Sequence, residues 1–201
     1  MRPISPHLWW VSSAAHGQVD EQASASALVQ SVRAEAVDLF VEALDALYYA
    51  RPIVWRTVFL AIRRQPLPSN RFRSEMRAAW AKRGGQMRIC LNDDLLLLDC
   101  ARRILLPYHG CGIKLYRGES VDNRRFKTYG LSWSSEIGVA RHYARNAARR
   151  FCSRSVLLSA EVKSEAIVSC IHKVSTYPLE FEYIVDRRQV KAADIKVIER
   201  F

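Results

Sequence analysis

The spacing of apolar residues changes once along this chain, near Gly112, and that change limits the folds that the chain can adopt. Before Gly112 apolar residues recur every three or four positions, as on one face of a helix. After it, most segments alternate apolar and polar residues, as in a strand. Helices followed by strands predict an α+β protein. Because 201 residues suffice for one well-packed core, we expect a single domain in which N-terminal helices pack on a split β-sandwich.

The first half is expected to be a helical lobe over residues 24–112, after a loose lead-in over residues 1–23. Gly84-Gly85 resembles the pair of residues that ends a helix, and Asn92 is predicted as the N-cap of the last helix. Helices are expected over residues 27–48, 53–62, 71–83 and 93–106, with a short strand or extended linker over residues 86–91.

The second half, residues 113–201, is expected to be the β-rich core. A basic turn is predicted between its first two strands, and a helix over residues 136–150 is the only one expected there. Strands are expected over residues 113–118, 155–162, 166–172, 180–186 and 194–200, and over a short segment that ends at Ser134.

The charge of the chain favours acidic partners. With 31 Lys and Arg against 20 Asp and Glu, the net charge is +11. Such a surface suits nucleic acid, an anionic membrane surface or an acidic protein, and charge alone does not choose among them. No stretch approaches the roughly 20 apolar residues of a membrane span, so we expect a soluble protein. We also expect a monomer.

Neither metal binding nor secretion through a signal peptide is expected. The five cysteines include no CxxC pair, and the five histidines are scattered. Asp93 and Asp94 suit the first turn of a helix better than a metal site. The apolar patch from Leu8 to Val11 is too short for the core of a signal peptide. We therefore expect a protein that is cytoplasmic in the producing cell, or that a secretion system delivers to a target cell.

Arg117 is the first candidate site residue. It is predicted near the end of a strand, next to Gly118, which would let a ligand approach the backbone closely. A guanidinium can hold phosphate oxygens in a bidentate manner. Taken alone, Arg117 would be an ordinary solvated arginine in so basic a chain.

A second candidate is Ser132-Trp133-Ser134. On an alternating strand the two serines share one face, and Trp133 points to the other. Ser134 or Ser135 is expected to cap the following helix. Ser132 lies too early in the sequence for that role, so its hydroxyl is free to orient a catalytic side chain.

The third candidate is Glu180-Phe181-Glu182, which would place two carboxylates on one face of a strand. One carboxylate can stabilise an oxocarbenium-like transition state while the other prepares a nucleophile. An ordinary edge strand has the same pattern, so this motif is weak by itself.

Taken together, the three motifs resemble those of the Arg-Ser-Glu class of mono-ADP-ribosyltransferases. LYRG at 115–118 is similar to the arginine motif of this family, GLSWSSEIGVARHYA at 130–144 to its Ser-Thr-Ser motif, and EFEYIVD at 180–186 to its Glu-x-Glu motif. Trp133 departs from the usual Thr and could reshape the nicotinamide pocket. The resemblance covers residues 113–201 and implies the fold of this family, with NAD as a substrate and no metal.

The resemblance also implies a role for each residue. Arg117, with Gly118 beside it, would brace the NAD phosphates and the nicotinamide ribose. Ser132 would position Glu182, which would bind the ribose 2′-hydroxyl and stabilise the cation that forms as nicotinamide leaves. Glu180 would activate the acceptor, for which arginine of a target protein is expected, and Tyr177 would contact that target. Ser132, Trp133 and Ser134 would line the NAD site, and a bacterial toxin or effector is implied.

Other readings remain open. The same fold could hydrolyse NAD or transfer an RNA 2′-phosphate to NAD. A basic protein that binds nucleic acid without catalysis is also consistent with RRFK at 124–127 and RNAARR at 145–150.

Overall fold

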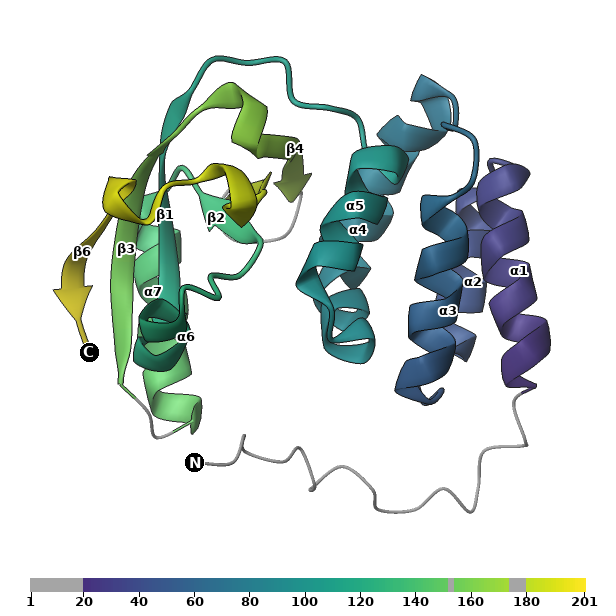
Figure 1. Cartoon of the computed structure of the whole chain (residues 1–201), viewed down its shortest axis with the longest axis horizontal. Coiled ribbons are helices and arrows are strands. Elements are labelled where there is room, and N and C mark those ends of the chain that lie inside the picture. Colours follow the sequence, from purple (N-terminus) through teal and green to yellow (C-terminus); the bar gives the residue numbers. More distant parts are fainter. Residues whose placement is uncertain (1–19, 152–153, 174–179) are drawn as a thin grey trace.

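Residues 20–151, 154–173 and 180–201 are described by a computed structural model of the chain. In Figure 1 the helices of the first half lie beside a sheet formed by the second half, with α4 and α5 next to the sheet. Both α4 and α5 contact strand β4. The first-half helices are α1 (Glu21–Arg33), α2 (Val37–Ala46), α3 (Pro52–Arg63), α4 (Asn70–Leu91) and α5 (Asp94–Ile104).

The predicted continuous helix over residues 27–48 is wrong, because the chain turns back between α1 and α2. Glu35 takes a positive φ of 53° in this turn, and its carboxylate accepts a hydrogen bond from the backbone amide of Ser69 at 2.8 Å. The apolar spacing continues through the break because each helix buries one face. Helix α1 also begins earlier than expected, with Asp20 as its N-cap.

The predicted end of a helix at Gly84-Gly85 is wrong as well. Helix α4 runs on to Leu91, so residues 86–91 are neither strand nor linker. A glycine inside a helix costs only about 1 kcal/mol, which the burial of Met87 and Leu91 outweighs. Asn92, at φ 48°, is the C-cap of α4 rather than the predicted N-cap of α5. The side chain of Asp93 caps α5.

The second half forms an antiparallel sheet in the order β4-β5-β2-β1-β3-β6, which confirms the α+β class. One bridge, Tyr116↔Ser134, joins β1 to β2, between the β4-β5-β2 and β1-β3-β6 halves of this single six-stranded sheet. The expected split β-sandwich stays a prediction. The strands are β1 (Ile113–Ser120), β2 (Ser132–Ser134), β3 (Ser155–Val162), β4 (Ile167–Lys173), β5 (Glu180–Val185) and β6 (Ile195–Arg200).

The basic turn predicted after the first strand is a short helix, α6 (Val121–Phe126), which Ser120 caps. The second half therefore contains this helix in addition to the expected one, α7 (Ile137–Phe151). Short 3-10 turns complete it: η1 (Ser164–Ala166), η2 (Arg187–Gln189) and η3 (Ala192–Asp194).

Two hydrophobic clusters form the interior. The first joins the helices of the first half to the sheet, because Leu131, Val168, Ile171 and Ile184 belong to it. The second lies among the strands and includes Trp133. None of the described helices is both long and apolar enough for a membrane crossing.

Helix α7 lies directly against β1 at Gly118. A Cβ at Gly118 would be 2.4 Å from the backbone nitrogen of Ala144 and 2.6 Å from the carbonyl oxygen of Ala140. Glycine at this position and alanines on the helix therefore let the two backbones approach closely. This contact fixes α7 beside the strand that carries Arg117.

Candidate functional site

Arg117, Ser132 and Glu182 form one chain of hydrogen bonds, although 65 residues of sequence separate the first from the last. The Nη1 group of Arg117 donates to the carbonyl oxygen of Ser132. The Ser132 hydroxyl donates to Oε1 of Glu182. Glu182 is buried while Ser132 is exposed. The three residues come from β1, β2 and β5, which places them where the two halves of the sheet meet.

Glu119, which the sequence analysis did not select, holds Arg117 in place. Its Oε2 accepts from Nε of Arg117 at 2.8 Å and from the Gly130 amide at 3.0 Å. Its Oε1 accepts from the Ser120 amide at 3.0 Å and from the Asn123 side chain at 2.9 Å. Glu119 thus connects the end of β1, helix α6 and the segment before β2.

The carboxylate of Glu119 is strongly stabilised in its charged form. Burial by itself would raise its pKa, because a charge loses hydration when it is buried. The neighbouring Arg117 and the hydrogen bonds from Gly130 and Asn123 outweigh burial and lower the pKa to about 2. The result is a permanent ion pair of Arg117 and Glu119 over the pH range of cells.

Gly130 leaves the space that the Arg117 guanidinium occupies. A Cβ at Gly130 would lie 2.1 Å from Nη2 of Arg117 and 2.5 Å from its Cζ. Any side chain at this position would therefore push the guanidinium aside. Glycine is needed here for the close approach of a side chain, not for a positive φ.

The other predicted residues of the first two motifs lie away from this chain of hydrogen bonds. The Trp133 side chain is buried in the second hydrophobic cluster, on the face of β2 opposite to the Ser132 side chain. The Ser134 hydroxyl accepts from the Glu136 amide at 3.0 Å, as expected for the start of α7. Gly118 faces α7. That Gly118, Trp133 and Ser134 contact a ligand stays a prediction.

The remaining predictions fall outside what the structure describes. Glu180 begins β5, pairs with Lys173 and stands two residues before Glu182, but its side chain is not among those described. Tyr177 lies outside the described residues altogether.

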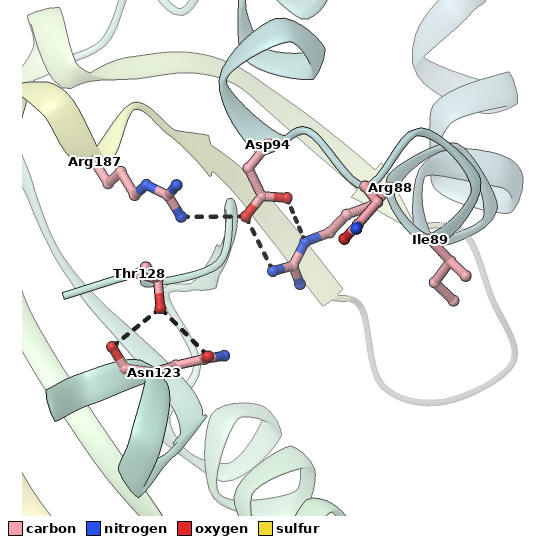
Figure 2. A pocket seen from close by; sticks show the side chains of 7 residues that line it. Arg88, Ile89, Asp94, Asn123, Thr128 and Arg187 are labelled. Carbon is pink, nitrogen blue, oxygen red and sulfur yellow. Dashed lines mark hydrogen bonds and ion pairs between the residues drawn. The ribbon is translucent and has the colours of Figure 1, made fainter. Parts of the chain in front are cut away.

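A cavity of about 330 Å³ lies between the helical lobe and the β-rich half. Its lining comes from α4 and α5 on one side and from α6, the following segment and η2 on the other, as Figure 2 shows. Polar and charged side chains dominate. The lining residues are Arg88, Ile89, Asn92, Asp94, Asn123, Thr128 and Arg187.

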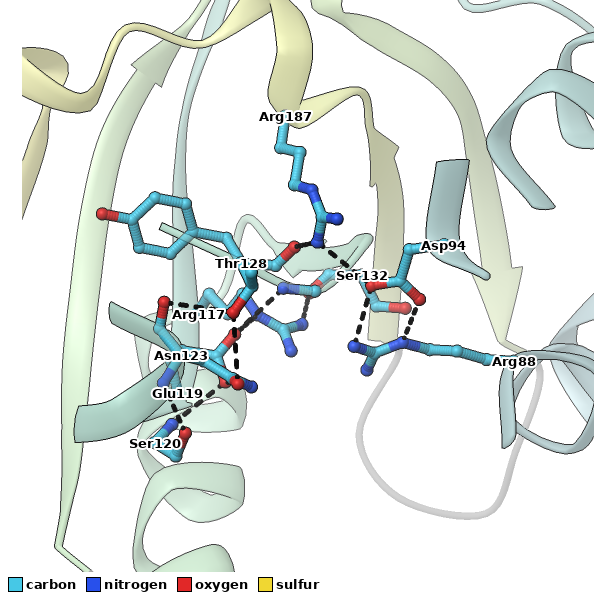
Figure 3. A network of polar contacts seen from close by, with 11 residues as sticks. Arg88, Asp94, Arg117, Glu119, Ser120, Asn123, Thr128, Ser132 and Arg187 are labelled. Carbon is cyan, nitrogen blue, oxygen red and sulfur yellow. Dashed lines mark hydrogen bonds and ion pairs between the residues drawn. The ribbon is translucent and has the colours of Figure 1, made fainter. Parts of the chain in front are cut away.

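The cavity and the Arg117 network share a residue. Asn123 lines the cavity, and its side chain donates to Glu119, which binds Arg117. Figure 3 shows this network together with Arg88 and Arg187. A ligand that fills the cavity would contact Asn123, which is linked to Arg117 through Glu119; Arg117, Ser132 and Glu182 are not among the lining residues.

Arg88 and Arg187 line the cavity as two additional cations. Burial by itself lowers the pKa of Arg88, but Asp94, with a smaller contribution from Glu119, raises it above its usual range. Arg187 donates to the carbonyl oxygen of Tyr129 at 2.9 Å. No motif in the sequence points to Arg88 or Arg187, because their proximity depends on how the two halves of the chain meet.

The chain was also compared with known proteins. No protein-family model, no curated protein and no solved structure matches it. Among the described residues, no three His, Cys, Asp or Glu side chains are grouped as metal ligands. The residues and geometry above are therefore the basis for any functional conclusion.

Proposed function

We propose that this protein is an NAD-dependent mono-ADP-ribosyltransferase, which transfers ADP-ribose from NAD to a macromolecular acceptor and releases nicotinamide. The observation that carries this proposal is the hydrogen bond between the Ser132 hydroxyl and Glu182, next to Arg117. The family resemblance assigns a role to each of these residues separately. Their arrangement in one connected group supports that assignment.

The geometry suits departure of nicotinamide by cleavage of its bond to the ribose C1′. The bonding electrons leave with nicotinamide, and the ribose becomes oxocarbenium-like. The Glu182 carboxylate stabilises this positive charge, and the Ser132 hydroxyl fixes the position of the carboxylate. An acceptor nucleophile then bonds to C1′ and loses a proton to a base, for which Glu180 is the proposed group.

The form of the sheet also supports the proposal. The resemblance implies a split β-sandwich, and in this six-stranded sheet a single bridge joins the half that contains β1 to the half that contains β2. Arg117 lies on one half, while Ser132 and Glu182 lie on the other. A substrate at this junction would contact both halves at once.

Exchange of single carboxylates tests the proposal. Glu182→Gln should reduce both ADP-ribose transfer and NAD hydrolysis at least about 100-fold, because it removes the main charge opposite the developing cation. Glu180→Gln should suppress transfer to arginine and leave measurable NAD hydrolysis. Labelled NAD, incubated with the protein and a cell lysate, measures both products. Glu161→Gln, an exposed carboxylate on β3, is the matched control.

Arg117→Ala should weaken NAD binding, measured by calorimetry, by about 1.5–3 kcal/mol, the usual loss for a charge-assisted contact.

Full activity of both glutamate variants would refute the proposal. If Glu182→Gln is active and Glu180→Gln is inactive, the catalytic glutamate is Glu180, two residues before the proposed Glu182. The product that carries ADP-ribose separates transfer from NAD hydrolysis and from RNA 2′-phosphotransfer.

A second candidate function is binding of nucleic acid. Helix α6 exposes Arg124 and Arg125, and Lys127 follows it; Phe126, 67% exposed, lies under the Arg125 guanidinium. Cations around an exposed aromatic ring suit phosphates and a stacked base. Salt-dependent binding of a single-stranded oligonucleotide without NAD turnover would favour this function.

A further inference from the structure

Asp94 binds two arginines that come from opposite sides of the cavity. Arg88, on α4, donates from Nε to Oδ1 of Asp94 at 2.8 Å and from Nη2 to Oδ2 at 3.1 Å. Arg187, on η2, donates from Nη1 to the same Oδ2 at 3.2 Å. Figure 2 shows the carboxylate between the two guanidiniums.

The charges of this group do not balance. Two guanidiniums share one carboxylate, so the three residues keep an excess of one positive charge. Their side chains are partly buried, with exposed fractions of 37% for Arg88, 15% for Asp94 and 21% for Arg187. Partial burial weakens screening by water and salt, and an anion is attracted more strongly there than at an open surface.

The cavity beside this group has the volume of a small ligand site, and its lining is mainly polar and charged. Its volume of about 330 Å³ lies at the lower end of the usual range for such sites. The side chains of Asn92, Asn123 and Thr128 also line it. The amide groups of Asn92 and Asn123 can donate hydrogen bonds to phosphate or sugar oxygens, whereas the Thr128 hydroxyl already donates to Asn123.

Arg117 is already engaged by the protein. Its Nε donates to Glu119 and its Nη1 to the Ser132 carbonyl, and its side chain is 13% exposed. A dinucleotide diphosphate carries two negative charges, and one arginine in an ion pair neutralises them poorly. Arg88 and Arg187 would supply further positive charge in a cavity that Asn123 and Glu119 link to Arg117.

We propose that Arg88 and Arg187 bind a phosphate or diphosphate group, and that Asp94 competes with that group for both guanidiniums. A carboxylate that binds one arginine through both oxygens imitates the way a phosphate binds it. Asp94 is thus an internal competitor that weakens anion binding. Only the identification of the ligand as the diphosphate of NAD rests on the proposed function.

Displacement of Asp94 need not separate α5 from η2. Arg188 still binds Asp99 of α5 at 2.9 Å, and Arg102 of α5 still binds Asp186 at 3.1 Å. These two pairs hold the elements together while Asp94 exchanges its partners for water. Replacement of Asp94 by an anion therefore requires only a local change in structure.

Calorimetric titration with inorganic pyrophosphate tests the proposal. Asp94→Asn should bind pyrophosphate at least about fivefold more tightly than the unmodified chain, since both guanidiniums lose their competing anion. Arg88→Gln and Arg187→Gln should each bind it at least about fivefold more weakly. Asp94→Ser repeats the first measurement with a smaller side chain if Asp94→Asn lowers folding stability.

Arg83 and Asp45 provide the matched controls. Arg83 is also on α4, and it binds Asp45 through two hydrogen bonds of 2.7 Å. Arg83→Gln and Asp45→Asn make the same charge changes away from the cavity, and should shift the affinity by less than about twofold. If Asp94→Asn behaves like Asp45→Asn, or binds pyrophosphate more weakly than the unmodified chain, the proposal is wrong.

Two further titrations identify the source of the phosphate. If Asp94→Asn binds ADP more tightly than the unmodified chain does, the ligand of the arginine site is a nucleotide diphosphate. The same gain with a single-stranded oligonucleotide, but not with ADP, supports the arginine site and assigns its phosphate to nucleic acid.

Failure of this proposal and failure of the proposed function give different results. If pyrophosphate affinity shifts as expected in a chain that does not cleave NAD, the arginine site stands and the transferase proposal falls. If NAD is cleaved while no cavity variant changes pyrophosphate affinity, the transferase proposal stands and the arginine site falls.

Discussion

Glu119 is a buried carboxylate, 4% exposed, whose two oxygens accept four hydrogen bonds. Such a group stabilises the folded state only while it is charged, and its pKa of about 2 lies below its ordinary value of 4.5. The unfolded chain therefore binds the proton more readily. The stability that Glu119 contributes is fully present above about pH 4.5 and is lost as the pH falls towards 2.

We predict that Glu119→Gln flattens the dependence of folding stability on pH over this range. The contribution that disappears is about 3 kcal/mol, at roughly 1.4 kcal/mol for each pKa unit. Denaturant unfolding at several pH values measures it. Glu199→Gln is the control, and should flatten the curve less because its ion pair with Arg141 is solvent-accessible. Parallel curves for Glu119→Gln and the unmodified chain would contradict the prediction.

At the scale of single residues, the sequence identified those site residues that belong to a motif. Arg117, Ser132 and Glu182 could be selected because their motifs follow one another in the order of a family pattern, and the structure joins them. Glu119 carries no such signal, because a Glu two residues after an Arg is common on any strand. Gly130 could be recognised only by the atoms that surround it.

At the scale of elements, the contact between β1 and α7 depends on the absence of a side chain at Gly118. The nearest atoms to a new Cβ belong to the backbone of α7, which cannot rotate aside as a flexible side chain would. Either the helix or the strand must move.

We therefore predict that Gly118→Ala lowers the free energy of unfolding by about 3 kcal/mol or more, the upper part of the range for overpacked cores. Gly138→Ala, on α7 itself, is the control. Its Cβ would have no neighbour within 4 Å, and alanine favours helix by up to about 1 kcal/mol. Urea denaturation measures both, and equal stabilities would show that α7 is not fixed at Gly118.

The positions of helices and strands followed well from periodicity, but their ends did not. The strands after Gly112 lie within one or two residues of expectation, because the loss of helical spacing shows directly in the sequence. Helix ends were misplaced where long-range contacts decided them. Glu35 turns the chain through its contact with Ser69, and α4 continues past two glycines because its later residues are buried.

At the scale of the whole molecule, the helical lobe and the sheet share one hydrophobic cluster. Leu131 and Ile184 from the sheet belong to the same cluster as Phe59 and Trp55 from α3. Neither half can bury these residues alone. If the chain is a single domain, as predicted, both halves should unfold cooperatively, and this cooperativity can be measured.

We predict that the protein unfolds as one unit. In native-state hydrogen exchange, buried amides of α3 and of β3 should open with the same free energy, equal to that of global unfolding. Opening of α1 to α3 at clearly lower free energy, with β3 still protected, would show two units. Neither the shared cluster nor the cavity between the halves could be predicted, since periodicity says nothing about which elements meet.

The turn between α4 and α5 separates Arg88 from Asp94 by six positions, with Asn92 in a left-handed conformation. Surface turns generally accept insertions and deletions during evolution. Here one residue added after Arg88 would rotate Arg88 by about 100° relative to the rest of the turn and remove it from Asp94. Natural variation in the length of this segment should therefore be rare.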